Sequence, residues 1–439
     1  MRLRPFVRAC VGIFAIAAAP GLAAQLSPSS LASGGPAYSV EGAAAAAGVP
    51  LFDPVPAVHG FAPWFADAVD RVVEEAIVRG AAPGAAVVVG HAGQIVLSKG
   101  WGHIDRVKGA PAVTDETVWD LASFTKVAAT TVAAMILVQD GTLDLDAPVH
   151  AYLSDWPKTG TRAQITVRQL LHHNSGLRAG ALKIGKGERA EITARLAKVP
   201  LAGTPGAKEL YGDLDMVLLG AVIESVAGEP LDQLLARRVY SPLGMSGTAY
   251  RPLAAGIPRE QIAATEKLGQ TALQGVVHDP IARDMGGVSG NAGLFASARD
   301  LATLASSLLW EAPERLVCRD VVEQFTRPVW GDQYALGWEN AADDTIWGEL
   351  FSREAYGHTG YTGTSIWIDP KLDLFVVLLT NRVNPSARNQ RHLELRRDLH
   401  WAVVRALADR IPEAAPRDGC LADRIEDGIR NLPPIYWPR

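Results

Sequence analysis

The chain has 439 residues, of which 48% are hydrophobic and 20% charged, and its formal net charge is -5. A chain of this length can bury one large core or two smaller ones. It contains no basic run of the kind that binds nucleic acid, and no acidic tail. Composition therefore predicts an ordinary globular protein with no nucleic-acid partner.

The first 24 residues have the pattern of an export signal. Three arginines in the first eight residues precede a short apolar stretch, Ala9–Ala19, and small residues before Gln25 suit cleavage. The apolar stretch is too short to span a bilayer. We therefore expect a cleaved signal peptide over residues 1–24 and a periplasmic or secreted bacterial protein with no stable membrane span. Retention of the segment as an anchor is the alternative.

Residues 25–60 are rich in Ala, Gly, Ser and Pro, which is typical of a flexible linker. We expect a folded domain over residues 61–415 and a tail over residues 416–439. Cleavage of the signal would leave Cys318 and Cys420. In an oxidising compartment this pair could form a disulfide, or the two could be unrelated thiols.

Two β-hairpins are predicted, one near each end of the domain. Their strand runs are rich in β-branched and apolar residues and are separated by short turns: Ala85–Gly90 with Ile95–Trp101, and Ser365–Asp369 with Leu374–Thr380. Helical spacing precedes the first hairpin over Pro63–Val78 and follows the second from about Gln390 to Arg410.

The middle of the domain, about residues 140–310, has many helix signals and few strand signals. Three helices are predicted there: one capped by Thr166 that runs to Leu171, one over Leu214–Ala227 that ends at Gly228, and one over Arg299–Trp310. Because strands at both ends enclose a helical middle, we predict an α+β fold. It has one antiparallel β-sheet flanked by the N- and C-terminal helices, and an inserted all-helical lobe. A cleft between the lobes is a natural ligand site.

Ser123-Phe124-Thr125-Lys126 is the only Ser-x-x-Lys in the chain, and it opens an apolar helical run, Val127–Val138. Residues three apart share one face of a helix, so the hydroxyl of Ser123 would lie beside the amine of Lys126. A serine nucleophile needs such an adjacent base. The N-terminus of the helix also favours developing negative charge.

Two further motifs follow in order. Tyr211-Gly212-Asp213 lies in a loop before the second predicted helix, and His358-Thr359-Gly360 precedes the second hairpin. Ser-x-x-Lys, Tyr-x-Asn and Lys- or His-Thr-Gly, in this order, form the pattern of the penicillin-recognising serine hydrolases. That family includes class C β-lactamases, low-molecular-weight penicillin-binding proteins, D-alanyl-D-alanine carboxypeptidases and related esterases. This chain resembles the family over roughly residues 63–410, and the resemblance implies a β-lactamase/transpeptidase-like fold.

The resemblance and the residue types imply a mechanism through an acyl-enzyme on Ser123. Lys126 must surrender or share a proton, and burial beside Tyr211 would disfavour its charged form, while Lys⁺ would favour the phenolate of Tyr211. The family implies that Tyr211 relays protons to the leaving group. The coupled Lys126–Tyr211 pair leaves the base unassigned. The resemblance also implies an oxyanion hole from the backbone N–H groups of Ser123 and Tyr361, with Thr359 and Gly360 beside it. No metal or other cofactor is required.

Two positions depart from the family pattern. His358 stands where many β-lactamases have Lys, and a mostly neutral His is a poor partner for a substrate carboxylate, which disfavours a dedicated β-lactamase. Asp213 replaces the usual Asn. An ionised Asp cannot donate to a substrate carbonyl and would hold Lys126 charged, so efficient amide acylation is in doubt. The alternative is that Asp213 is only the N-cap of the next helix.

Three other segments mimic functional motifs. Lys158-Thr159-Gly160 is expected to be a surface turn, because it precedes the Tyr motif and no strand follows it closely. Ser289-Gly290-Asn291 lies in a Gly-rich loop that could line the cleft. His172 and His173 are adjacent, but no Asp, Glu or Cys stands at ligand spacing, so we expect a structural cap and no metal site.

The sequence therefore predicts an exported serine hydrolase, most similar to a D-alanyl-D-alanine carboxypeptidase or penicillin-binding protein. Its substrate would be a small molecule or a peptidoglycan-derived peptide or ester. A carboxylesterase and a β-lactamase are alternatives within the family. A non-catalytic sensor of peptidoglycan fragments or penicillin is the alternative of another class.

Overall fold

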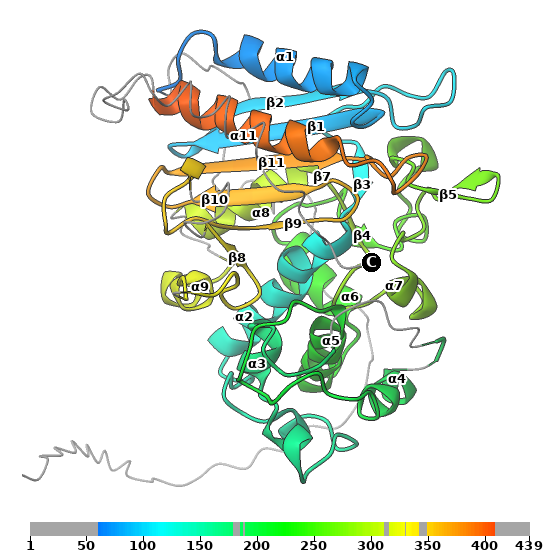
Figure 1. The fold of residues 1–439 in the computed structure, drawn as a ribbon, viewed down its shortest axis with the longest axis vertical. Helices are drawn as coiled ribbons and strands as arrows, with labels where there is room; N and C mark the ends of the chain where they lie inside the picture. Colours follow the sequence, from blue (N-terminus) through cyan, green and yellow to red (C-terminus); the bar gives the residue numbers. More distant parts are fainter. Residues whose placement is uncertain are drawn as a thin grey trace, which may run out of the picture. The chain divides into compact units, whose positions relative to one another are not determined.

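The computed structural model describes residues 60–178, 185–187, 189–310, 316–329, 331–341 and 349–408 (Figure 1). The expected signal peptide, nearly all of the expected linker and the expected tail lie outside these residues. Cys318 is exposed, and its thiol has no disulfide partner among the described residues. Cys420 lies outside the described residues, so a disulfide between the two stays a prediction.

A six-stranded antiparallel sheet joins the two ends of the domain. Its strand order is β2-β1-β11-β10-β9-β8. The strands are β1 Gly84–His91, β2 Gln94–Gly102, β8 Glu339–Asn340, β9 Tyr356–Thr359, β10 Ser365–Asp369 and β11 Leu374–Thr380. Strand β1 pairs with β11, with Val88 opposite Val377, so the two predicted hairpins form one sheet. Both hairpins are confirmed, and β10 and β11 have the predicted bounds.

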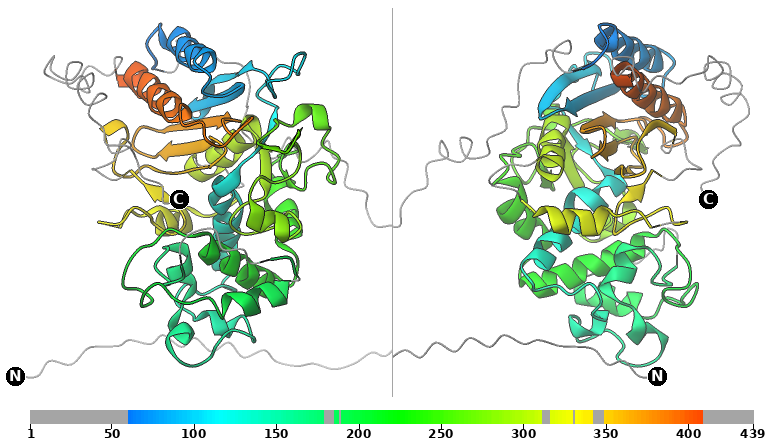
Figure 2. Two further views of the ribbon diagram at one scale, coloured as in Figure 1. Left: turned by 45° about the vertical axis from the view of Figure 1, so that its right-hand side comes forward. Right: turned by 90° about the vertical axis from the view of Figure 1, so that its left-hand side faces the viewer.

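Helices α1 (Phe65–Val78) and α11 (His392–Ala408) cover one face of this sheet (Figures 1 and 2). Successive residues of a strand point to opposite faces, and on β1 both faces are buried. Val87 and Val89 pack in the core below α1 and α11, while Ala86 and Val88 belong to the core on the other side. The predicted sheet with flanking terminal helices is confirmed.

The opposite face packs against α8 (Ala298–Leu309), whose N-terminus is capped by the hydroxyl of Ser297. The strand before it, β7 (Leu294–Ser297), pairs with β3 (Val118–Asp120). Strand β7 and helix α8 lie within the range that we expected to form the helical lobe, about 140–310. The helix at 298–309 exists, but it serves the sheet, because it contacts β1 and β11.

In the helical lobe, the helical run that contains α2 (Val132–Gln139) packs beside α5 (Asp213–Ala227) (Figure 1). The chain turns through Ala122–Phe124, continues in a π-helical stretch over Lys126–Thr131 and then forms α2 (Val132–Gln139). Although the run Ala122–Gln139 is apolar and long enough to cross a membrane, 83% of its residues are buried, as in a core helix. It packs on α5 (Asp213–Ala227), which ends at the left-handed Gly228.

Helix α3 (Val167–Leu171) begins with the predicted cap. The side chain of Thr166 accepts from the backbone of Gln169, and the side chain of Gln169 binds the backbone of Thr166 in return. The remaining α-helices and strands of the described residues are short: α4 Arg189–Leu196, α6 Leu231–Leu235, α7 Pro280–Asp284, α9 Arg319–Thr326, β4 Ala249–Tyr250, β5 Lys267–Leu268 and β6 Thr271–Ala272.

Candidate active site

Ser123 lies just after a strained turn between β3 and the core helix. The preceding residue, Ala122, has a φ of +47°, a left-handed conformation that costs a non-glycine residue about 1–3 kcal/mol. Its backbone N–H donates to Oδ1 of Asp120, 2.9 Å away, and the backbone of Leu121 donates to Leu294. These bonds hold the turn, and with it the position of Ser123 at the start of the helix.

Lys126 connects the nucleophile to two other segments. Its Nζ donates to Oγ of Ser123 at 2.9 Å, to Oδ1 of Asp213 at 2.8 Å and to the backbone oxygen of Asn291 at 3.3 Å. An ammonium has three donors, so all of them have protein partners. The Nζ atom also lies 5.0 Å from the ring centre of Tyr211. The structure thus brings Ser123, Lys126, Tyr211 and Asp213 together, as the motif order predicted.

The Lys126–Asp213 pair is ionic at neutral pH. Burial lowers the pKa of Lys126, but the carboxylate of Asp213 and then Tyr211 raise it by more, so its pKa lies above the ordinary lysine value. Burial raises the pKa of Asp213, and the charge of Lys126 lowers it by more, to below its usual range. Burial disfavours the charged amine, as expected, but the carboxylate of Asp213 outweighs the loss of water and holds Lys126 charged, which was also expected.

Tyr211 is a neutral phenol at rest. Burial raises its pKa above the ordinary value, and the lowering influence of Lys126 does not compensate. Lys126 favours the phenolate, as expected, but the neutral phenol is the resting form. Because its hydroxyl interacts with both Lys126 and Ser123, the phenol is placed to donate a proton near the nucleophile.

Asp213 is not the cap of α5. The N-cap is Gly212, and Asp213 is the first helical residue, so the alternative assignment as an N-cap was wrong. Its side chain is 25% exposed and points toward Lys126. The carboxylate also has a side-chain hydrogen bond with Asn291. Asp213 therefore belongs to the hydrogen-bond network around the nucleophile, and also gains from the positive end of the helix dipole.

The turn at Thr359–Thr364 is tied directly to the nucleophile turn. The hydroxyl of Thr362 donates to the backbone oxygen of Asp120 at 2.6 Å, and that of Thr364 donates to Leu121 at 3.1 Å. Only glycine fits at position 360, because an added Cβ would lie 2.3 Å from the oxygen of Leu121. This close approach brings the turn that carries Tyr361 against the turn that precedes Ser123. The backbone N–H of Tyr361 has no protein acceptor among the described residues, which leaves it for an oxyanion.

His358 is buried on β9 and carries no charge. Its side chain contacts the backbone oxygen of Thr359 through Nδ1, at 2.7 Å, and its Nε2 has no partner in the described part of the chain. Burial, followed by the charge of Lys126, lowers the pKa of His358 to about 3. The ring centre lies 6.0 Å from that of Tyr211. At neutral pH His358 therefore cannot act as a cation for a substrate carboxylate.

Two residues that the sequence did not suggest pack around Tyr211. The ring of Tyr334 stacks on it, with centres 5.2 Å apart and planes 19° apart. The ring centre of His173 lies 4.8 Å from that of Tyr211. The Nδ1 atom of His173 lies 3.2 Å from Oδ2 of Asp215, which holds the imidazole in place. Tyr334 occurs in no motif with a chemical signature. The nearest sequence signal is that Tyr334 lies four residues before another aromatic residue, Trp338.

The Gly-rich loop lines the site, as the sequence allowed. Besides accepting from Lys126, Asn291 donates through Nδ2 to Oδ1 of Asp279 at 3.2 Å. A Cβ on Gly290 would lie 2.0 Å from the backbone oxygen of Met216, so the loop rests directly on α5. In contrast, Lys158-Thr159-Gly160 is an exposed turn, as predicted.

Tyr361 forms an exposed aromatic surface at the rim, with 52% of its area accessible. The guanidinium carbon of Arg382 lies 4.3 Å from the ring centre, and its Nε donates to the backbone oxygen of Tyr361 at 2.6 Å. The ring of His278 stacks against Tyr361 at 5.6 Å. These contacts hold the loop that carries the backbone N–H of Tyr361.

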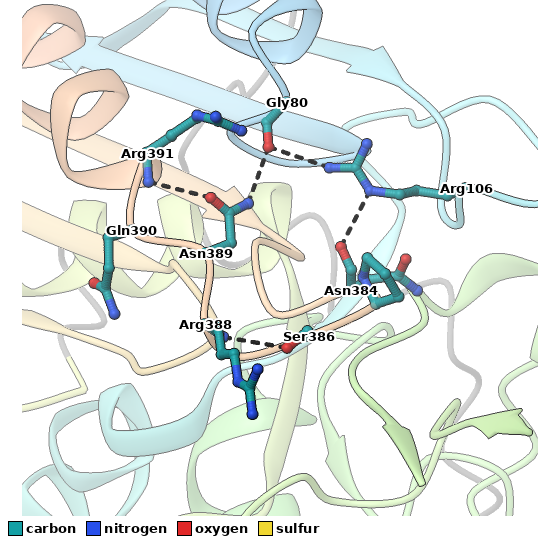
Figure 3. A pocket seen from close by; sticks show the side chains of 9 residues that line it. Gly80, Arg106, Asn384, Ser386, Arg388, Asn389, Gln390 and Arg391 are labelled. Carbon is teal, nitrogen blue, oxygen red and sulfur yellow. Dashed lines mark hydrogen bonds between the residues drawn. The ribbon is translucent and has the colours of Figure 1, made fainter. Parts of the chain in front are cut away.

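One pocket of about 580 Å³ lies away from these groups (Figure 3). Its lining is rich in arginine and amide groups: Gly80, Arg106, Asn384, Pro385, Ser386, Arg388, Asn389, Gln390 and Arg391. The amide of Asn389 donates to Gly80 at 2.9 Å, and Arg106 donates to Asn384 at 3.2 Å. None of the residues around the nucleophile lines this pocket, so it does not bear on the chemistry of Ser123.

Comparisons with known proteins agree with this geometry. The sequence model of the beta-lactamase family matches residues 69–400. The chain is 37% identical to the "N-acetylmuramyl-L-alanine amidase" of Bacillus subtilis, over 72% of this chain and 80% of that protein. It is 35% identical to the "Putative D-alanyl-D-alanine carboxypeptidase" of Escherichia coli O157:H7, over 71% of this chain and 81% of that protein.

Solved structures with the same fold include EstCE1, a hydrolase with promiscuous acyltransferase activity. It matches with a TM-score of 0.63 and 23% identity, over 77% of this chain and 98% of that one. A penicillin-binding protein homologue from Caulobacter crescentus matches with a TM-score of 0.60 and 21% identity, over 76% and 97%. At these identities the likeness concerns the fold. With the family match over most of the domain, the chain therefore belongs to the β-lactamase family of serine hydrolases.

Proposed function

We propose that this protein is an exported serine hydrolase that forms an acyl-enzyme on Ser123 and removes D-alanine from peptidoglycan-derived peptides. The observation that carries the proposal is the hydrogen bond of 2.9 Å between Nζ of Lys126 and Oγ of Ser123, inside a network that also holds Tyr211. The names of the bacterial relatives support the substrate class. The basic and apolar N-terminus supports action outside the cytoplasm.

The resting protonation states define the first step. Lys126 is an ammonium and cannot accept a proton until it gives one up, and Asp213 is the carboxylate that it contacts. When substrate excludes water, transfer of a proton from Lys126 to Asp213 frees the amine. The amine then takes the proton of Ser123 as Oγ attacks the carbonyl. The oxyanion that forms accepts from the backbone N–H of Tyr361.

Collapse of the tetrahedral intermediate needs a proton on the leaving group. Tyr211 is a neutral phenol, so it can donate that proton. Lys126 then reprotonates the phenolate, and Asp213 returns its proton to Lys126, which restores the resting pair. A water molecule that attacks the acyl-enzyme uses the same sequence with Ser123 as the leaving group. Acylation therefore moves the proton of Ser123 to the leaving group, and deacylation replaces it with a proton from the attacking water.

Ester hydrolysis is the second candidate, because of the charges beside Ser123. A D-alanyl-D-alanine peptide ends in a carboxylate, which a nearby cation would help to bind. Lys126 is paired with Asp213, and His358 is neutral, so neither offers a free positive charge. Asp213 also cannot donate a hydrogen bond to an amide carbonyl. Esters have better leaving groups and need less of this assistance.

Three substrates separate the candidates. Purified protein and its Ser123→Ala variant are incubated with a fluorescent penicillin, with an acylated D-alanyl-D-alanine peptide and with a short-chain nitrophenyl ester. We expect Ser123-dependent labelling and release of D-alanine. Ester turnover alone would favour the esterase, rapid loss of the label would favour a β-lactamase, and stable label without turnover would favour a sensor. No Ser123-dependent reaction with any of them would overturn the proposal.

A further inference from the structure

Three side chains with metal-ligating atoms meet close in sequence to an aromatic group formed by His173, Tyr211 and Tyr334. His172 follows α3, Glu209 lies in the loop before α5, and Asp332 lies in the loop before β8. One ligand atom from each lies within 4.8 Å of the other two. Sequence spacing gave His172 no partner, because its two partners come from distant parts of the chain.

The imidazole of His172 is oriented by the backbone. Its Nδ1 lies 3.3 Å from the carbonyl oxygen of Ala335, which can only accept, so Nδ1 carries the hydrogen. In the neutral ring this leaves a lone pair on Nε2, and Nε2 lies 3.0 Å from Oδ2 of Asp332. Two acceptors this close repel each other unless a proton or a metal ion lies between them. Metal-bound histidines commonly donate their other N–H to a backbone carbonyl in this way.

The carboxylate of Glu209 is also fixed in place. Its two oxygens accept from the backbone N–H groups of Gln333, at 3.3 Å, and Tyr334, at 3.0 Å. Each carboxylate oxygen has a second lone pair, so both stay able to bind a metal. The side chains of His172 and Asp332 are 12% and 36% exposed, which gives an ion a path from solvent.

The donor set selects the type of ion. One imidazole and two carboxylates suit a divalent transition metal such as Zn²⁺, whereas Ca²⁺ and Mg²⁺ prefer oxygen ligands alone. Two ligands bound about 2.1 Å from a tetrahedral zinc lie about 3.4 Å apart, close to the separation between His172 and Asp332. We propose that His172, Glu209 and Asp332 bind one Zn²⁺ ion, with water completing its coordination.

The consequence of such an ion is to position Tyr211. Each ligand is one or two residues from a member of the aromatic group: His172 from His173, Glu209 from Tyr211, and Asp332 from Tyr334. The segments also share a backbone hydrogen bond of 2.7 Å, from Leu210 to His173. An ion would therefore join the three chain segments that hold the phenol. It would act on stability and on the order of the site, and take no part in bond breaking.

Zinc binding to the purified chain tests this directly. The protein is stripped with a chelator, desalted and titrated with Zn²⁺ in competition with a chromophoric chelator. We expect one equivalent to bind. His172→Ala and Asp332→Asn each remove a ligand and should weaken zinc binding by about 100-fold or more. Losing a residue that only hydrogen-bonds a metal ligand already costs about 10- to 100-fold in affinity. Asp320→Asn removes an exposed carboxylate on α9, outside the cluster, and should bind zinc like the wild type.

A second variant and a direct probe cover the other outcomes. Glu209→Gln keeps the size of the side chain and should also weaken binding, if the circular dichroism of each zinc-free variant matches the wild type. X-ray absorption should show only nitrogen and oxygen at about 2.0–2.2 Å. No stoichiometric binding, full affinity in the ligand variants, or sulfur in the first shell would overturn the proposal, and His172–Asp332 would then be an ion pair only.

Discussion

Replacing Asp213 by Asn should change the protonation of Lys126 and, through it, the pH dependence of acylation. The two charges lie 2.8 Å apart and the lysine side chain is fully buried. Coulomb's law with an effective dielectric constant of about 20 gives an attraction of about 6 kcal/mol, roughly four pKa units. Because burial lowers the pKa of Lys126, removal of the carboxylate should leave an amine whose pKa lies below its ordinary value.

The assay is the rate of Ser123 acylation in a single turnover, measured between about pH 5 and 10 with the fluorescent penicillin or the ester. In the wild type the rate should rise toward alkaline pH, since Lys126 stays charged. In Asp213→Asn the rise should move down by several pH units, and acylation at pH 7 should be at least about tenfold faster, because each pKa unit is a factor of ten in the neutral fraction. Asp215→Asn is the matched control: it lies on the same helix, but it contacts His173 and Ser175 instead of Lys126.

Stability provides a second measurement on the same variant. The raised pKa of Lys126 stabilises the fold below the ordinary lysine pKa, and this contribution is lost at higher pH. The lowered pKa of Asp213 stabilises the fold above the ordinary aspartate pKa, and this contribution is lost in acid. The variant should therefore differ most from the wild type at neutral pH. If neither the acylation profile nor the neutral-pH stability changes, Asp213 does not control Lys126 and the reasoning is refuted.

Three further outcomes are expected. Gly360→Ala places a Cβ 2.3 Å from the backbone oxygen of Leu121. The rate of acylation should fall, and the unfolding free energy should drop by about 1–3 kcal/mol. An unchanged rate would mean that the loop carrying Tyr361 tolerates displacement. Tyr334→Ala removes the ring stacked on Tyr211 and should lower the unfolding free energy by about 3–5 kcal/mol. Tyr334→Phe keeps the ring and should cost much less. Equal losses in the two variants would exclude stacking as the cause. The pKa of His358 is lowered to about 3, so the unfolded chain binds more protons than the folded chain between about pH 6.5 and 3. The free energy of unfolding should therefore fall as the pH is lowered through this window. A His358→Gln variant with the same pH profile would assign the loss to other groups.

Local pattern predicted the elements of this fold well. The β10–β11 hairpin has the predicted bounds because two apolar β-rich runs enclose a short turn, and Thr166 is followed three residues later by Gln169, the signature of a capping box. The partner of α8 could not be predicted in the same way. An apolar face shows that a helix packs, but not on which sheet. Helix α8 lies against β1, which ends at His91, and β11, which begins at Leu374, and both are far from it in sequence.

The site shows the same division between local and long-range information. Motif order predicted that Ser123, Lys126 and Tyr211 lie together, because each lies in a short segment with a recognisable residue pattern. The charge state of Lys126 depends on a distance of 2.8 Å to a residue 87 positions away, so burial and pairing could not be weighed from sequence. Tyr334 and the cluster of His172, Glu209 and Asp332 come together only through the packing of separate loops.

The identity of the nucleophile is the central claim, and covalent labelling tests it most directly. The protein is treated with a fluorophosphonate probe, which forms a stable bond with an activated serine, and the adduct is located by mass spectrometry of proteolytic peptides. We predict one adduct, on Ser123, and none in Ser123→Ala, with the two proteins unfolding at similar temperatures. An adduct on another serine, or no adduct on the folded wild type, would contradict the account.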